Sequence, residues 1–378
     1  MIFNYCKRML LHAALVAGLA VLVGCGGGGS GGDSGVLGGG VPSGVPTTTS
    51  SAVLNPTAPA GQILIGNEFD GPFVLDLRTG NYVELLALDW EERMDRNIFA
   101  GLWVRFSDDR QEIIESETSC SLRAGALTRD DCVIFRDSAG RETSRFTIPS
   151  GSTSGLGLHP PAQLSPDGQF VAAAVDLELD GLGRLHIYNR EGDLLSVSAE
   201  NQLLSGDQFA WLPDNSLVYA SDQTLYLTTP NSAQGLVFVE FPPNAGRPAQ
   251  LALSPDGTRL AFTLITVPRP FRGSVWIINL DGSAFNRLAL TQPEDELRIR
   301  FPTWSPDGNQ IFLVDGSVPL QFAYIVPADG EDVLLTVDQP TEAIRIESFY
   351  NRDVSGFASF TDPEPSFDVF SNGLQWLQ

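Results

Sequence analysis

The stretch Ser254-Pro255-Asp256-Gly257 is the most informative part of this chain, because it recurs. Further copies stand at residues 165–168 and 305–308, and an altered copy, Leu-Pro-Asp-Asn, fills residues 212–215. From one proline to the next the steps are 47, 42 and 51 residues. A repeat of this length is typical of a propeller or an array. The repeated turn therefore predicts the architecture.

Each copy marks the same place between two strands. Proline presets φ at the first corner of the turn, the aspartate side chain can bond backbone amides, and glycine accepts positive φ. After the turn at 254–257, strand-like runs follow at 260–262 and 275–278, and a second turn, 281–283, precedes a fourth strand. Four short strands per repeat make one propeller blade. We therefore expect an all-β propeller of four-stranded blades.

Less regular copies extend the series at both ends. Residues 106–110 align with the turn, and residues 63–77 resemble a blade without its first strand. The run 333–337 is expected to be the fourth strand of its blade. Part of the C-terminal stretch 344–378 should pair with the N-terminal blade, because a closed ring leaves no edge strand at the seam. If that stretch only completes the N-terminal blade the ring has six blades, which we favour; if it forms its own, seven.

The repeat resembles the propeller repeat of the TolB C-terminal domain, a WD40-like (PD40) repeat. The resemblance rests on an aromatic residue before Ser-Pro-Asp-Gly, a strand ending in Ala-Phe, and the sequence Trp-Ile-Ile-Asn-Leu-Asp-Gly at residues 276–282. It covers about residues 61–337 and is strongest at 253–290 and 304–337. Proteins of many activities use this propeller, so the resemblance implies the fold and says little about function.

The N-terminus reads as an export signal over residues 1–24. Lys7 and Arg8 precede an apolar core at residues 9–23, which is short for a membrane span of about 20 residues. The signal ends in Leu-Val-Gly before Cys25, which resembles a bacterial lipobox. That resemblance implies cleavage before Cys25 and acylation of its sulfur, and Gly26 in the next position favours the outer membrane. An ordinary secreted protein is the alternative interpretation.

Residues 25–60 are almost wholly Gly, Ser, Pro, Thr and Val. Such a segment buries too little apolar surface to offset its ordering entropy, so we expect a flexible tether with an average reach of about 30–35 Å. Residues 61–378 follow as a single propeller domain, a size that all-β barrels and propellers often reach as one unit.

The charge of the chain excludes several function classes. Removal of Lys7 and Arg8 with the signal changes the formal net charge from −23 to −25, leaving arginine as the only basic side chain apart from histidine. An acidic surface repels nucleic acid, so no nucleic-acid partner is expected. Chemistry that needs a lysine base or a Schiff base is excluded as well.

The cysteines agree with export. Once Cys6 has left with the signal and Cys25 carries lipid, only Cys120 and Cys132 remain. In an oxidising compartment such a pair is most simply a disulfide.

No catalytic constellation stands out in the sequence, and we expect no enzyme activity. The mature chain has two histidines, His159 in a loop and His186 within a strand, where packing is the simpler role. Propeller lyases of pectin fragments, which share this repeat, hold metal with a histidine cluster that this chain lacks. No Gly-x-Ser-x-Gly elbow occurs.

One acidic loop is a weak calcium candidate. It contains Asp176, Glu178 and Asp180 followed by glycine, which can wrap Ca²⁺, but no glutamate stands at the twelfth position. A plain solvated loop is the interpretation we favour, and no other cofactor is indicated.

Function is expected on the loop-rich face, opposite the repeated turns. Arg269, Phe271 and Arg272 combine two guanidinium groups with an aromatic anchor, as binding hot spots do, although an exposed loop with chance arginines is the simpler interpretation. We interpret the protein as a non-catalytic scaffold, lipid-anchored in the cell envelope and facing the periplasm or the cell surface. Its expected partner is an envelope protein. The alternative is a periplasmic glycan-binding or glycan-degrading propeller.

Overall fold

A computed structural model describes the strands of the chain and the turns between most of them. The described residues are 48–49, 61–65, 73–77, 81–84, 102–107, 111–122, 129–137, 140–149, 162–175, 183–204, 209–232, 234–243, 245–265, 273–291, 299–315, 322–335, 344–347 and 374–377. The chain divides into two compact units, Met1–Val36 and Leu37–Gln378, and all described residues belong to the second. These ranges contain no helix long and apolar enough to cross a membrane.

The described strands form six sheets, which we number in chain order. Sheet 1 contains, in order of pairing, β1 (Thr48–Thr49), β4 (Asn81–Glu84), β3 (Phe73–Asp76), β2 (Gln62–Ile65) and β27 (Gln375–Leu377). Sheet 2 contains β5 (Leu102–Phe106), β6 (Glu112–Leu122), β7 (Arg129–Asp137) and β8 (Glu142–Pro149). Sheet 3 contains β9 (Gln163–Leu164), β10 (Phe170–Val175), β11 (Gly183–Asn189) and β12 (Leu194–Val197), with β13 (Leu203–Leu204) also paired to β11.

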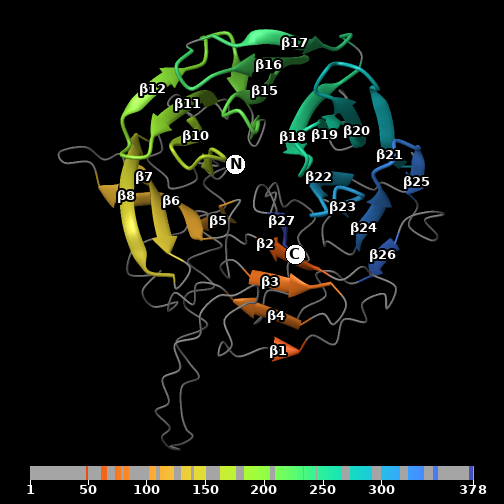
Figure 1. Cartoon of the computed structure of the whole chain (residues 1–378), viewed down its shortest axis with the longest axis horizontal. Coiled ribbons are helices and arrows are strands. Elements are labelled where there is room, and N and C mark those ends of the chain that lie inside the picture. The colour runs from red at the N-terminus through yellow and green to blue at the C-terminus, as the bar shows by residue number, and fades with distance from the viewer. Residues whose placement is uncertain are drawn as a thin grey trace, which may run out of the picture. The chain divides into compact units, whose positions relative to one another are not determined.

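The other three sheets repeat this plan. Sheet 4 contains β14 (Phe209–Trp211), β15 (Leu217–Ser221), β16 (Thr224–Thr228) and β17 (Leu236–Glu240). Sheet 5 contains β18 (Arg247–Leu253), β19 (Arg259–Ile265), β20 (Gly273–Asn279), β21 (Asn286–Thr291) and β25 (Val333–Leu335). Sheet 6 contains β22 (Ile299–Trp304), β23 (Gln310–Asp315), β24 (Phe322–Pro327) and β26 (Ile344–Glu347). Within the second unit the sheets follow one another around a common centre (Figure 1). The all-β prediction with four-stranded antiparallel units is confirmed, and the number of blades stays a prediction.

The repeated turn forms as its sequence predicts. In the copy at 254–257 the Ser254 hydroxyl donates to Asp256 Oδ1 (2.6 Å) and accepts the backbone N–H of Arg259 (2.9 Å). Gly257 has φ +69° and donates its N–H to the Ser254 carbonyl (2.9 Å). The copies at 165–168 and 305–308 have the same bonds. In the less regular copy the Ser107 hydroxyl accepts the N–H of Glu112 (3.0 Å), five positions later. The turn serines at 165, 254 and 305 form the same bond, which confirms that Ser107 is their equivalent.

The hydrophobic core lies between neighbouring sheets. One cluster joins sheets 5 and 6 through residues such as Leu288 and Ile311, and another joins sheets 4 and 5 through Leu225 and Phe262. Comparable clusters lie between sheets 2 and 3 and between sheets 3 and 4. Sheets 3, 4 and 5 therefore bury both faces against their neighbours, which explains why several of their middle strands are apolar in nearly every position.

The C-terminal strand closes the ring as expected. β27 pairs antiparallel with β2, with Gln62 opposite Leu377. On its other side the Gln375 side chain accepts the N–H of Phe106 (3.0 Å) and donates to the Phe106 carbonyl (3.3 Å), so it continues the pairing pattern toward sheet 2. The strand Gln375–Leu377 thus completes a sheet whose other strands lie near the N-terminus of the chain.

One strand lies in a different place from the prediction. The fourth strand of sheet 6 is β26, while Val333–Leu335 pairs in parallel with β21 of sheet 5. Val333 and Leu335 are both buried in the cluster between sheets 5 and 6, and Asp332 just before them forms an ion pair with Arg287. Burial of two alternate apolar side chains and this ion pair favour the parallel position over a hairpin.

Candidate functional site

A cavity of about 900 Å³ opens among the repeated turns. All six sheets contribute the strand nearest the centre to its wall: β5, β9, β14, β18, β22 and β27. Pockets of this size are typical of small-molecule and cofactor sites in proteins. The sequence predicted a functional surface on the loop-rich face of the propeller. This cavity lies on the opposite face, where the repeated turns are.

The rim of the cavity is built from turn prolines. Pro166, Pro213 and Pro255 are exposed there, each at the first corner of its turn, and Pro306 is half-buried. Proline fixes φ and each turn is closed by its own hydrogen bonds, so the rim is stiff. A surface that is already ordered loses little conformational entropy when it binds a partner.

Two inner strands bulge in matching positions of the cavity wall. Gln250 in β18 and Phe301 in β22 both have φ +56°, and each precedes the serine of its turn by four residues. The pairing register shifts across each of them, between Ala249 and Ala252 and between Arg300 and Thr303. The Phe301 N–H donates to Gln250 Oε1 (3.1 Å), so one bulge supports the other. Left-handed backbone in a non-glycine residue is strained, and such residues and bulges gather at functional sites.

Side chains from one inner strand bond the backbone of the next around the cavity. The Gln163 amide donates to the Phe209 carbonyl (3.3 Å), in the way that Gln375 bonds Phe106. The Trp211 indole N–H donates back to the Gln163 carbonyl (3.0 Å), and the Trp304 indole N–H donates to the Ala252 carbonyl (2.9 Å). These polar lining groups are already engaged in holding the wall together.

The charges of the lining balance. The wall includes two arginines, Arg105 and Arg190, and two acidic residues, Glu112 and Asp167. Arg190 forms an ion pair with Glu112 and also donates to the Gly168 carbonyl (3.1 Å). The Asn215 amide donates to Asp167 (2.8 Å). The cavity is therefore close to neutral in a chain whose formal charge is −23.

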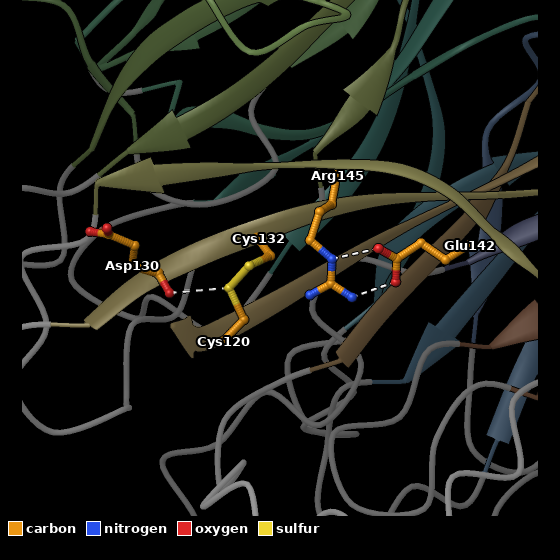
Figure 2. Close-up of a disulfide and its surroundings, with 5 residues drawn as sticks. All are labelled: Cys120, Asp130, Cys132, Glu142 and Arg145. Carbon is orange, nitrogen blue, oxygen red and sulfur yellow. Dashed lines mark hydrogen bonds and ion pairs between the residues drawn. A yellow bond between two sulfur atoms is a disulfide. The ribbon is translucent and has the colours of Figure 1, made fainter. Parts of the chain in front are cut away.

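The disulfide prediction is confirmed. Cys120 and Cys132 are bonded across the β6–β7 hairpin with their Cα atoms 5.8 Å apart, and the Asp130 carbonyl lies 3.4 Å from Cys120 Sγ (Figure 2). On the neighbouring strand Arg145 Nε donates to Glu142 (2.6 Å) (Figure 2). This bond is the largest cause of the raised pKa of Arg145. The disulfide lies away from the cavity wall, and its role is to fix the long β6–β7 hairpin.

The remaining predicted site residues lie outside the described ranges. They are Cys25, the calcium candidate Asp176, Glu178 and Asp180, and the loop residues Arg269, Phe271 and Arg272. Within the described part of the chain no three His, Cys, Asp or Glu side chains gather as a metal site would require. His186 is described and buried, with Nδ1 3.1 Å from the Tyr188 hydroxyl, which agrees with a packing role. Burial raises the pKa of that Tyr188 hydroxyl.

Sequence reasoning missed the cavity wall. Gln250 and Phe301 are 51 residues apart, which is also the step between Pro255 and Pro306. Both residues precede the serine of their turn by four positions, so the sequence could have shown that they occupy equivalent places in two blades. That this position bulges toward a cavity is not visible in the residue types, because neither glutamine nor phenylalanine favours positive φ.

Comparison with known proteins identifies the architecture. No protein-family model and no curated protein matches the sequence. The fold is similar to TolB from Acinetobacter baumannii, with a TM-score of 0.51 and 14% identity, covering 84% of this chain and 66% of that one. Similarity extends to a TolB-type structure from Agrobacterium tumefaciens (TM-score 0.43, 16% identity, 72% of this chain and 86% of that one). It also extends to the periplasmic gluconolactonase of Pseudomonas aeruginosa (TM-score 0.46, 16% identity, 72% and 81%).

At these identities the likeness concerns the fold alone. The predicted resemblance to TolB-type propellers is confirmed at that level. This chain spans slightly less than two thirds of the length of the A. baumannii TolB. Proteins of many activities use one fold, so the fold does not decide between a binding and a catalytic role.

Proposed function

We propose that this TolB-type propeller is a non-catalytic scaffold that binds another protein of the cell envelope. In this proposal the chain is acylated at Cys25 and held away from the outer membrane by the tether at residues 25–60. The expected partner is a folded or extended polypeptide, and the expected contact surface is the turn-side cavity with its proline rim.

The cavity carries this proposal. It offers a near-neutral, partly apolar surface in a protein whose overall charge would repel most acidic partners. Its wall is braced by hydrogen bonds between sheets 1 and 2, sheets 3 and 4, and sheets 5 and 6, so a partner meets a preformed site. Several lining polar groups are engaged in bonds within the propeller, which suits recognition by shape better than acid–base chemistry.

Site-specific photo-crosslinking in intact envelopes tests the proposal. A photo-reactive residue replaces Gln169 on the exposed cavity rim, or Phe271, which follows β19 and precedes β20 in the sequence. The matched control is Ser144, which is exposed on β8, the outer strand of sheet 2, away from the cavity wall. We expect one specific crosslinked protein from position 169 and none from position 144.

The other outcomes discriminate between functions. Crosslinks from position 271 alone would move the binding surface to the loop-rich face. No protein crosslink from either position, together with binding of purified protein to cell-wall polysaccharide fragments, would favour the glycan alternative and overturn the scaffold proposal.

A further inference from the structure

The outer edge of sheet 4 exposes two large apolar side chains. Leu236 is 73% exposed and Val237 is 63% exposed, the highest values among large apolar residues in the described part of the chain. Both belong to β17, whose only hydrogen-bonded neighbour among the described strands is β16. An edge strand with exposed apolar residues is a template for pairing with another chain.

These side chains are exposed on a strand that is firmly held. Gly235, just before β17, lies so close to Tyr219 that a Cβ there would be 2.3 Å from the tyrosine oxygen. At the other end of the strand the Phe241 N–H donates to the Gln223 carbonyl (2.8 Å). Phe238 and Val239, between these ends, pack against the core between sheets 4 and 5. Fraying therefore does not explain the exposure of Leu236 and Val237.

The equivalent edge of sheet 5 already carries an added strand. Val237 pairs with Tyr226 just after a bulge in the register of β16, and Arg287 pairs with Trp276 just after the matching bulge in β20. β17 and β21 are thus the same strand of successive sheets. On β21 the chain adds its own strand β25, in parallel, and Asp332 at the entry to β25 pairs with Arg287.

Sheet 4 has an apolar residue where sheet 5 has the arginine of that ion pair. An added strand on β17 would therefore need an apolar side chain at the position that Asp332 occupies on β21. The formal charge of −23 disfavours a second copy as the occupant, because two acidic proteins would meet and Glu240 would lie at the contact. A partner segment with basic flanks would meet no such repulsion.

We propose that β17 is a strand-addition site for an extended segment of a partner protein, apolar in its centre and basic at its flanks. The main-chain bonds of the new strand would supply affinity, and Leu236 and Val237 would select its side chains. This site lies on the outer edge of a blade and is independent of the turn-side cavity.

A peptide based on the sequence of β25 tests the inference. The probe is residues 331–338 with lysine in place of Glu331 and Asp338 and valine in place of Asp332, carrying a fluorescent label. We expect saturable binding to the full-length protein in detergent, measured by fluorescence anisotropy. Val237→Lys should weaken it by about tenfold or more, because an edge lysine opposes strand pairing.

Leu194→Lys is the matched control. Leu194 is 51% exposed and follows the corresponding bulge on β12, the outer strand of sheet 3. Binding should survive this substitution, and both variants should keep the wild-type melting temperature because the replaced side chains are exposed. Absence of saturable binding, or equal binding by wild type and Val237→Lys, would overturn the proposal. So would a concentration-dependent dimer that Val237→Lys dissolves, since the occupant would then be a second copy. A failed crosslink at Gln169 bears on the cavity and leaves this result unchanged.

Discussion

The junction between sheets 3 and 4 and the junction between sheets 5 and 6 share one plan and differ in chemistry. In both, a tryptophan indole donates to a carbonyl of the preceding inner strand. In both, the residue five positions after the turn serine covers that tryptophan. At the first junction it is Phe170, stacked on Trp211 at 6.4 Å between centroids. At the second it is Arg259, with its guanidinium carbon 4.6 Å from the centre of the Trp304 ring.

This contrast defines what the fold requires at a junction. Phe170 contributes only ring contact, whereas Arg259 also donates to the Gly308 carbonyl (2.8 Å) and the Ala328 carbonyl (2.7 Å). At the junction between sheets 2 and 3 the equivalent residue is Glu112, which acts through Arg190 to reach the Gly168 carbonyl. The plan therefore fixes a position and a contact with the next sheet, and leaves the residue type open.

Removal of the tryptophans should have the largest effect. Trp211→Ala and Trp304→Ala should each lower the free energy of unfolding by about 3–5 kcal/mol, since each removes a large buried ring and its hydrogen bond. Trp304→Ala should lie at the upper end, because the contact that it removes from Arg259 is a cation–π interaction in addition to packing. Urea denaturation followed by circular dichroism measures both. A loss below about 1 kcal/mol for either variant would contradict the shared plan.

Glycine substitutions in the turns should separate two neighbouring junctions. Gly257 and Gly308 have nearly equal φ, +69° and +70°. A Cβ on Gly257 would lie 2.4 Å from Pro213 Cγ in sheet 4, whereas the nearest atom to a Cβ on Gly308 is 3.7 Å away. Gly308→Ala should cost about 1–2 kcal/mol from backbone strain alone, and Gly257→Ala about 1–3 kcal/mol more from overpacking.

Pro213→Ala is the control for this difference. Combined with Gly257→Ala it removes the clashing ring atoms. The overpacking part of the loss in free energy of unfolding should therefore be much smaller in the double variant. If Gly257→Ala and Gly308→Ala prove equally destabilising with Pro213 in place, the two turns are not distinguished by packing.

Substitution of the covering residues should have a smaller effect that still separates the two junctions. Arg259→Met keeps an apolar stem over Trp304 and leaves two carbonyls without their donor, at a cost of about 1–3 kcal/mol. Phe170→Leu reduces ring contact without breaking a hydrogen bond and should cost about 1 kcal/mol. Urea denaturation measures the loss in free energy of unfolding for both variants. A larger loss for Phe170→Leu than for Arg259→Met would contradict the expectation that the hydrogen-bonded arginine contributes more than the stacked ring.

The smallest effect should come from the turn aspartates at low pH. The hydroxyls of Ser254 and Ser305 donate to Asp256 and Asp307 and, together with backbone N–H groups, hold the pKa of each carboxyl below its usual value. A lowered native pKa contributes stability above the unfolded pKa of about 3.9, and that contribution is lost as the pH falls through the lowered pKa. Asp256→Asn with Asp307→Asn should therefore flatten the acid limb of the stability curve below about pH 4.

Ser254→Ala provides the site-specific check. Without the hydroxyl donor the pKa of Asp256 should rise toward its usual value while that of Asp307 stays low, as carboxyl-carbon NMR titration would detect. An unchanged pKa of Asp256 would show that the backbone donors alone account for its position.

Local features of the fold were predictable and long-range ones were less so. The turns at 165–168, 254–257 and 305–308 form as expected because serine, proline, aspartate and glycine each fix one part of the turn. The disulfide and the pairing of the C-terminus with the N-terminal sheet followed from cysteine number and ring closure. The position of Val333–Leu335 was predicted wrongly, because its place depends on a neighbouring sheet that the local pattern does not contain.

The candidate site divides in the same way. Residue order alone specified the repeat, the blade plan and the turn that shapes the cavity rim, since each depends on residues within a few positions of one another. The folded arrangement was needed to bring inner strands from six sheets around one cavity and to make Gln250 and Phe301 bulge into its wall together. Among the described strands it also leaves the outer edge of β17 without a neighbour, while β25 covers that of β21. These features escape local patterns because burial and hydrogen bonding between sheets act through space, across some 50 residues of intervening chain at each blade step.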